Sequence, residues 1–164
     1  MPDEGPVVTN SGPLIGLAAA GKLDLLGALF DSVLVPAAVY QEVVGAGLGR
    51  PGTDELPRAP WATVIHVDPP PEPLLAEELG PGEAEAITLA RNRKARLLLL
   101  DDRRARRIAE VAYGLRVKGA AGILLEAKRR GLVAAVRPLV EAMQAQGYRL
   151  SERLVRGVLQ ETGE

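Results

Sequence analysis

The chain has 164 residues, of which 47% are hydrophobic and 25% charged, as is typical of a soluble globular domain. It contains no Cys and one His, which excludes disulfides, thiolate catalysis and a histidine-rich zinc centre. Twenty Lys and Arg against 21 Asp and Glu give a net charge of −1, so bulk charge does not indicate nucleic-acid binding, and any catalysis must depend on carboxylates.

The N-terminus lacks the basic and apolar regions of a signal peptide, and no apolar run is long enough to span a membrane. Because Cys is absent as well, we expect a cytoplasmic protein with no membrane partner. The length favours a single domain over residues 1–164, with a C-terminal helical segment over about residues 132–164.

Strand-like and helix-like stretches alternate along the first half of the chain. The hydrophobic patterns predict, in order, a strand at 6–10, helices at 13–21 and 23–30, a strand at 32–36, a helix at 36–44 and a strand at 62–67. Residues 45–60 are rich in Gly and Pro and predict a loop, and residues 68–73 form a Pro-rich spacer.

The second half of the chain is more regular. Its patterns predict a helix at 82–94, a strand at 95–102, a helix at 103–114, a strand at 115–117, and helices at 120–131, 136–147 and 151–161. The strand at 95–102 contains four consecutive Leu, which is typical of a central parallel strand buried on both faces. The alternation predicts a three-layer α/β/α fold with a parallel sheet.

Acidic or amide side chains follow the predicted strands at four places. These are Asn10, Glu42, the pair Glu83 and Glu85, and the pair Asp101 and Asp102. Ligands of open parallel sheets bind beyond the carboxyl ends of the strands, so we expect these groups to converge there. Converging oxygen ligands favour Mg²⁺ or Mn²⁺, and such a cluster supports metal-assisted phosphodiester hydrolysis.

Each pair of acids leaves an alternative open. On a helical wheel, Glu83 falls in the apolar face, whereas Glu85 projects toward the polar side and is expected to be solvated. We therefore predict Glu83 as the site residue, with Glu85 as the alternative. Asp101 and Asp102 must point to opposite faces of the strand end, and either one could cap the following helix.

Five stretches of the chain, taken in order, resemble the PIN-domain superfamily of ribonucleases. The closest resemblance is to a prokaryotic branch, related to VapC toxins, that is classed as a domain of unknown function. The stretches are "VVTNSGPLIGLAAAGKLDLL", "VPAAVYQEVV", "LGPGEAEAITLA", "LLLLDDRRARRIAE" and "GAAGILLEAKRRGLV", and the tail "GYRLSERL" continues the resemblance.

The resemblance implies a three-layer α/β/α fold, acids around Mg²⁺ or Mn²⁺, and single-stranded RNA as the substrate. It also implies a role as the toxin of a toxin–antitoxin pair, with an antitoxin protein as partner, and a homodimer by analogy. The metal ligands of the family fall on Asn10, Glu42, Glu83 and Asp102. Glu42, Glu83 and Asp102 are then the catalytic acids, and the auxiliary residues are Asn10, Ser11, Glu85 and Asp101.

The chain departs from the family pattern at two positions. Typical PIN domains have Asp where this chain has Asn10, although the branch accepts Asn there. The branch usually has Gly-Thr where this chain has Gly119 and Ala120, so a hydroxyl near the expected site is missing. An uncharged amide contributes less to metal binding than a carboxylate, so we expect weaker metal binding.

Eight basic residues lie between Arg91 and Arg107, and four more follow between Lys118 and Arg130. They could form a phosphate-binding surface beside the acids, for which Arg103, Arg104 and Lys118 are the RNA-binding candidates. The alternative is that they are solvated helix faces. With one Trp, one Phe and three Tyr, the sequence does not favour base-specific stacking.

Two other functions compete with the nuclease. A catalytically inactive PIN-like binding or assembly module is motivated by Asn10 and Ala120. A receiver or nucleotide-binding domain is suggested only by the adjacent Asp101 and Asp102. It is disfavoured because the chain has no P-loop, and no acid pair or GxGxxG motif after its first strand.

Overall fold

The computed structural model describes residues 4–47 and 49–164 of the chain. Within these ranges five parallel strands form one sheet in the order β3-β2-β1-β4-β5. The strands are β1 (Val7–Thr9), β2 (Val33–Pro36), β3 (Ala62–Ile65), β4 (Leu97–Leu99) and β5 (Val117–Lys118). Val8 is in register with Leu34 on one side and Leu98 on the other, so β1 is the middle strand.

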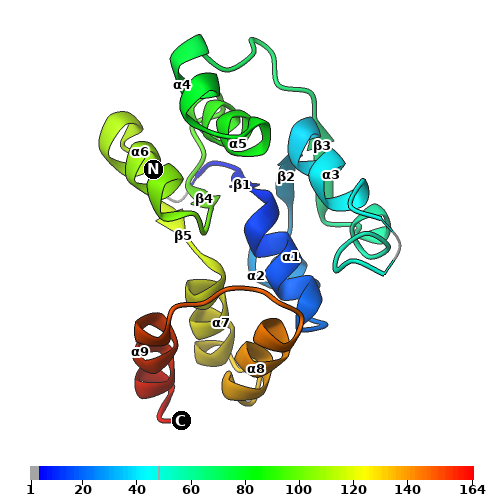
Figure 1. Ribbon diagram of the computed structural model, residues 1–164, viewed down its shortest axis with the longest axis vertical. Coiled ribbons are helices and arrows are strands. Elements are labelled where there is room, and N and C mark those ends of the chain that lie inside the picture. Colours follow the sequence, from blue (N-terminus) through cyan, green and yellow to red (C-terminus); the bar gives the residue numbers. More distant parts are fainter. Residues whose placement is uncertain (1–3, 48) are drawn as a thin grey trace.

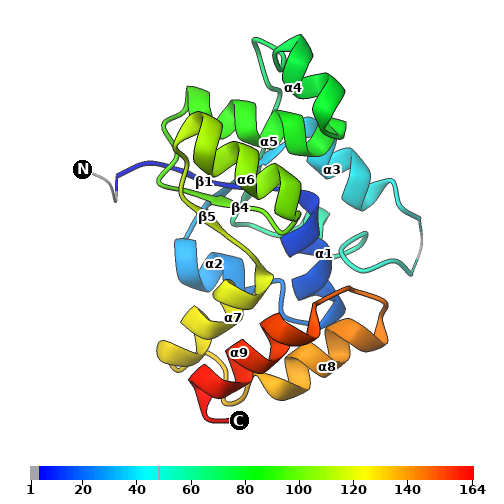
Figure 2. The same ribbon diagram turned by 60° about the vertical axis from the view of Figure 1, so that its left-hand side comes forward.

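Helices cover both faces of this sheet, as Figures 1 and 2 show. The helices are α1 (Ser11–Ala19), α2 (Leu25–Phe30), α3 (Ala37–Val44), α4 (Pro73–Glu78), α5 (Pro81–Asn92), α6 (Arg103–Tyr113), α7 (Ala120–Arg129), α8 (Arg137–Ala145) and α9 (Glu152–Thr162). In Figure 2, α4, α5 and α6 lie on one side of the strands and α2, α7, α8 and α9 on the other. Within the described ranges, none of the helices has the length and apolar content needed to cross a membrane.

The apolar side chains of the strands alternate between two separate cores. Val7 and Leu99 belong to the larger core, which includes buried residues of α1, α2, α7 and α8. Val8 and Leu98 belong to the smaller core with α5 and α6. Because successive side chains of a strand point to opposite faces, the middle strands must be apolar throughout to fill both cores. The predicted three-layer α/β/α architecture is confirmed.

The strand order reverses at β1. β1 leads to β2 on one side, and the chain later returns to place β4 on the other side. Open parallel sheets bind ligands at such a switch point, beyond the carboxyl ends of the two strands. Asn10 follows β1 and Asp101 comes two residues after β4, so both lie at this point of the fold.

The structure adds two elements that the sequence patterns did not predict. Helix α4 begins at Pro73, directly after the Pro-rich spacer, and proline is well suited to the first turn of a helix. A single 3₁₀ turn, η1 (Leu56–Arg58), interrupts the predicted loop at 45–60. Both elements are short, and neither has enough residues to establish a helical hydrophobic period.

Candidate active site

Asn10 follows β1 at the switch point, and its side chain is buried, with 5% of its surface exposed. Its backbone N–H donates a hydrogen bond to the carbonyl oxygen of Leu99 at 2.8 Å, which ties the residue to β4. Its extended backbone continues the alternation of β1, which places Asn10 on the same face as Val8 and therefore toward α5 and α6. Its side-chain oxygen has no hydrogen-bond partner within the described ranges. A buried polar atom left unpaired costs about 1–3 kcal/mol, so this oxygen is suited to a ligand.

Asp102 lies on the same face of the sheet as Asn10. Leu98 and Leu100 pack into the core with α5 and α6, and Asp102 continues this alternation beyond the end of β4. Its Oδ1 accepts a hydrogen bond from the N–H of Ala105 at 2.9 Å, so Asp102 caps the N-terminus of α6. The cap uses one oxygen of this exposed carboxylate, so the other oxygen could serve the site.

Asp101 points to the opposite face, as the sequence predicted for one member of the pair. Its Oδ1 accepts a hydrogen bond from the N–H of Ala120, the first residue of α7, at 2.8 Å. Its Oδ2 accepts a hydrogen bond from the hydroxyl of Tyr148. Burial, followed by the charge of Asp101, raises the pKa of Tyr148 above its ordinary range, so the hydroxyl remains a donor. Both oxygens of Asp101 are therefore used within the protein, and Asp102 is the better candidate.

Glu83 is the third residue of α5, and its side chain is half-buried. Its Oε1 accepts a hydrogen bond from the N–H of Gly80 at 3.4 Å. Burial and the nearby carboxylates of Asp102 and Glu42 raise the pKa of Glu83, against the Gly80 N–H, which lowers it. Asp102 and Glu42 are thus each close enough to influence Glu83, and the fold leaves Glu83 without a cationic partner among the residues described.

Glu42 and Glu85 connect α3 and α5 through a reciprocal pair of hydrogen bonds. The Oε1 of Glu42 accepts from the N–H of Gly82 at 3.0 Å, and the Oε1 of Glu85 accepts from the N–H of Ala38 at 3.0 Å. Each carboxylate therefore lies at the N-terminus of the other helix, where the helix dipole favours negative charge. A Cβ on Gly82 would lie 2.5 Å from both Glu42 oxygens, so this contact requires glycine.

The expectation that Glu85 is solvated was wrong. Its side chain is half-buried and binds the first turn of α3, which packs along that side of α5. The helical wheel compared only residues of one helix and did not include the neighbour that covers its polar side. Glu85 is occupied in joining two helices, whereas Glu83 faces Asp102 and Glu42.

Among the described residues, no three Asp, Glu or His side chains lie close enough to chelate one metal ion together. Mg²⁺ commonly keeps several waters and binds proteins through only one or two carboxylates. The unpaired oxygen of Asn10 and the raised pKa of Glu83 both indicate a place where a cation would be stabilised. One or two of these carboxylates with the amide oxygen of Asn10 therefore fit a hydrated divalent ion, whose waters could reach the other acids.

The other predicted residues lie around this group of acids. Ser11 is the first residue of α1 and is half-buried. Arg104 forms an ion pair with Glu78 of α4, so its guanidinium is directed away from β5. Arg103 and Lys118 both line a hollow between α6 and the C-terminal segment. The three RNA-binding candidates are thus divided between two surfaces.

Tyr148 is the residue that sequence reasoning missed. It lies 47 positions from Asp101 along the chain and shares no motif with it. Only the resemblance of the tail "GYRLSERL" connected this segment to the rest of the chain.

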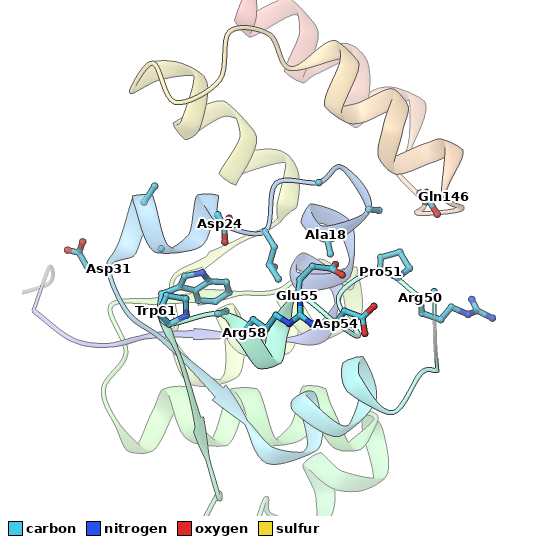
Figure 3. Close-up of a pocket in the computed structure, with 18 residues that line it drawn as sticks. Ala18, Asp24, Asp31, Arg50, Pro51, Asp54, Glu55, Arg58, Trp61 and Gln146 are labelled. Atoms are coloured by element: carbon cyan, nitrogen blue, oxygen red, sulfur yellow. The ribbon is translucent and has the colours of Figure 1, made fainter.

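A separate hollow of about 1060 Å³ lies between the α1–α2 region and the segment that precedes β3 (Figure 3). Trp61 lies against it, and its rim carries charged side chains of both signs, among them Asp24, Asp54 and Arg58. None of the predicted site residues lines this hollow. It is therefore distinct from the acids at the switch point.

A protein-family model described as a PIN domain matches residues 6–164. No curated protein and no solved structure matches the chain. Because the family model covers nearly the whole length and the fold agrees with it, the chain belongs to the PIN-domain family, a nuclease-type superfamily whose members generally use divalent metal ions.

Proposed function

We propose that this protein is a Mg²⁺- or Mn²⁺-dependent endoribonuclease that cleaves single-stranded RNA. The observation that carries the proposal is that Glu83 lies close to both Glu42 and Asp102 beside the switch point of the sheet. The buried, unpaired oxygen of Asn10 on the same face supports it. Membership of a nuclease-type superfamily gives the reaction class.

In this mechanism Asn10, Glu42, Glu83 and Asp102 would hold a hydrated divalent ion, with one or two carboxylates as direct ligands and the others bound through its water molecules. When bound, the ion polarises a phosphoryl oxygen and lowers the pKa of a water molecule. Glu83 lies near both Asp102 and Glu42, and it would take up the proton of the attacking water if it holds the ion through that water molecule. The Gly82 N–H fixes Glu42, and Asp102 keeps one oxygen on the N-terminus of α6, so these two side chains are held in position before substrate arrives.

The biological setting follows from the resemblance alone. A role as the toxin of a toxin–antitoxin pair, binding to an antitoxin protein, homodimer formation and a cytoplasmic location remain predictions. They are independent of the chemistry proposed for the site.

The direct test is cleavage of a mixed-sequence single-stranded RNA by the parent protein and by Asp102→Asn, each with Mn²⁺ and with a chelator. The asparagine can still cap α6, so the variant should remain folded. We expect the parent to cleave only with Mn²⁺ and the variant to be inactive. Equal cleavage by both proteins would indicate a contaminating ribonuclease or a different site.

A second candidate function is an inactive PIN-like binding or assembly module. It is favoured by the uncharged side chain of Asn10 and by the use of both Asp101 oxygens within the protein. This function predicts no cleavage and no binding of Mn²⁺ at millimolar concentration. Both outcomes are measured on the same purified protein.

A further inference from the structure

A groove of about 890 Å³ runs along the edge of the sheet formed by β5. Side chains of α6 line one side of it, and residues 149–161 line the other, with β5 and the first turns of α7 between them. Figures 1 and 2 show the same arrangement, with α6 and α9 on either side of the chain that leads from β5 into α7. The C-terminal segment therefore supplies one wall of this groove.

The groove is lined by more cations than anions. Its cationic residues are Arg103, Arg106, Arg107, Lys118, Arg149 and Arg153. Its acidic residues are Asp101, Glu110 and Glu161. The positive charges come from both walls and from the strand between them, so the groove as a whole attracts anions.

Within the part of the chain that the structure describes, most of these cations have no acidic partner. Arg106 interacts with Glu110 at 3.9 Å, and Glu161 pairs with Arg129, which does not line the groove. Asp101 is occupied by Tyr148 and Ala120. Over residues 4–47 and 49–164, the remaining five cations of the groove form no ion pair.

One end of the groove lies at the carboxyl end of β4, beside Asp102 along the chain. Asp101 lines the groove, and Asp102, the next residue, caps α6 on the face of Glu83. Arg103 follows directly and also lines the groove. A chain of phosphates lying along the groove would thus reach the carboxyl end of β4, where Asp102 follows Asp101.

We propose that this groove binds the phosphodiester backbone of single-stranded RNA, and that the C-terminal segment is part of the substrate-binding surface through Arg149 and Arg153. The inference rests on the proposed function, because it takes RNA as the substrate. Unpaired cations on two facing walls are the feature that a polyanionic strand requires. No residue that lines the groove is aromatic, so binding depends on phosphates and is tolerant of base sequence.

The competing occupant is an acidic amphipathic peptide. Val111 and Leu154 are large apolar residues of the groove with 79% and 43% of their surface exposed. They could contact the apolar face of such a peptide. The salt dependence and the variants described next separate the two occupants.

The test measures binding of a fluorescently labelled oligouridylate in the presence of a chelator, which prevents metal-dependent cleavage. The variant is Arg149→Gln/Arg153→Gln, in which two exposed side chains lose their charge. We expect affinity to fall about tenfold at 0.1 M salt, and the slope of log K against log salt to decrease by about 1.4, since each phosphate contact contributes about 0.7. Arg107→Gln, from the facing wall, should reduce the slope by about 0.7.

The matched control is Lys22→Gln/Arg93→Gln, which removes two exposed cations that do not line the groove. It should leave the affinity and the slope unchanged. Equal effects of the groove and control variants, or no RNA binding by the parent, would overturn the proposal. Competition by a poly-glutamate peptide with an apolar stripe, combined with a salt slope that the groove variants do not change, would assign the groove to a protein partner instead.

Failure of this inference and failure of the proposed function are distinguishable. Cleavage by the parent with Mn²⁺, with binding unaffected by the groove variants, would keep the nuclease and reject the groove. If the groove variants weaken RNA binding but the parent does not cleave RNA, the groove is supported as the RNA-binding site and the nuclease function is rejected.

Discussion

The hydroxyl of Tyr148 donates a hydrogen bond to Oδ2 of Asp101, and this contact joins the segment after α8 to the carboxyl end of β4. Oδ1 of the same carboxylate accepts from the N–H of Ala120 at the start of α7. Asp101 therefore links the start of α7 and the segment after α8 to the carboxyl end of β4. Its neighbour Asp102 points to the opposite face of the sheet and caps α6. The two consecutive acids therefore bind different helices.

Tyr148→Phe should destabilise the protein while leaving the chemistry unchanged. The substitution removes a hydrogen bond to a charged group, which is worth about 1.5 kcal/mol, and leaves Asp101 with a single donor. The shift of the urea unfolding midpoint measures this loss. RNA cleavage per folded molecule should match that of the parent. A loss of cleavage with unchanged stability would place Asp101 in the active site.

Glu85→Gln should reduce stability without reducing activity. Glu85 accepts the Ala38 N–H at the start of α3, and a neutral amide interacts less favourably with a helix N-terminus. We expect a loss of about 0.5–1 kcal/mol in the free energy of unfolding. Loss of cleavage beyond the loss of folded protein would reverse our preference for Glu83.

Asn10→Asp should strengthen metal binding and lower the stability of the metal-free protein. The buried oxygen of Asn10 has no partner in the described part of the chain, and a buried carboxylate there would lack a compensating charge. We expect a lower melting temperature in chelator and a larger rise on addition of Mn²⁺ than for the parent. Thermal unfolding with and without Mn²⁺ measures both effects. An identical Mn²⁺ response in the two proteins would exclude position 10 from the metal site.

The anchoring of α8 and the end of α9 should depend on pH. The Glu164 carboxylate accepts hydrogen bonds from the N–H groups of Arg137, at 3.0 Å, and Val136, at 2.9 and 3.1 Å. These bonds lower the pKa of Glu164 from 4.5 to about 2. A lowered pKa means that the stabilisation is complete above about pH 4.5 and is lost as the pH falls toward about 2.

Unfolding in urea at several pH values within this window tests the prediction. Glu164→Gln should be less stable than the parent at neutral pH, and the difference should shrink as the pH falls. A constant difference across the window would show that the charge of Glu164 does not contribute.

The layers of the fold were predictable from the sequence because the middle strands are apolar at nearly every position, and the structure buries them on both faces. The four Leu of residues 97–100 fill both cores alternately, as a strand buried on both faces must. Helix α4 was not predicted, since its six residues follow a Pro-rich spacer and bury only Leu75.

The site was predictable as a set of positions but not as a set of contacts. Strand alternation correctly placed Asp101 and Asp102 on opposite faces of the sheet. Which of them faces α5 depends on which Leu side chains of β4 point into each core. The roles of Glu85 and Tyr148 depend on partners 47 residues away in each case. No local pattern in the sequence carries that information.

The most direct measurement is the Mn²⁺ dependence of RNA cleavage by the parent, by Glu83→Gln and by a control, Glu77→Gln, on an exposed position of α4. The amide oxygen that replaces the Glu83 carboxylate can still accept the Gly80 N–H, so the start of α5 should be preserved. The account predicts no cleavage in chelator, cleavage with Mn²⁺ by the parent and the control, and at least about a tenfold loss of activity for Glu83→Gln at any Mn²⁺ concentration. Cleavage in chelator, or equal rates for Glu83→Gln and the parent, would contradict a metal-dependent nuclease centred on these acids.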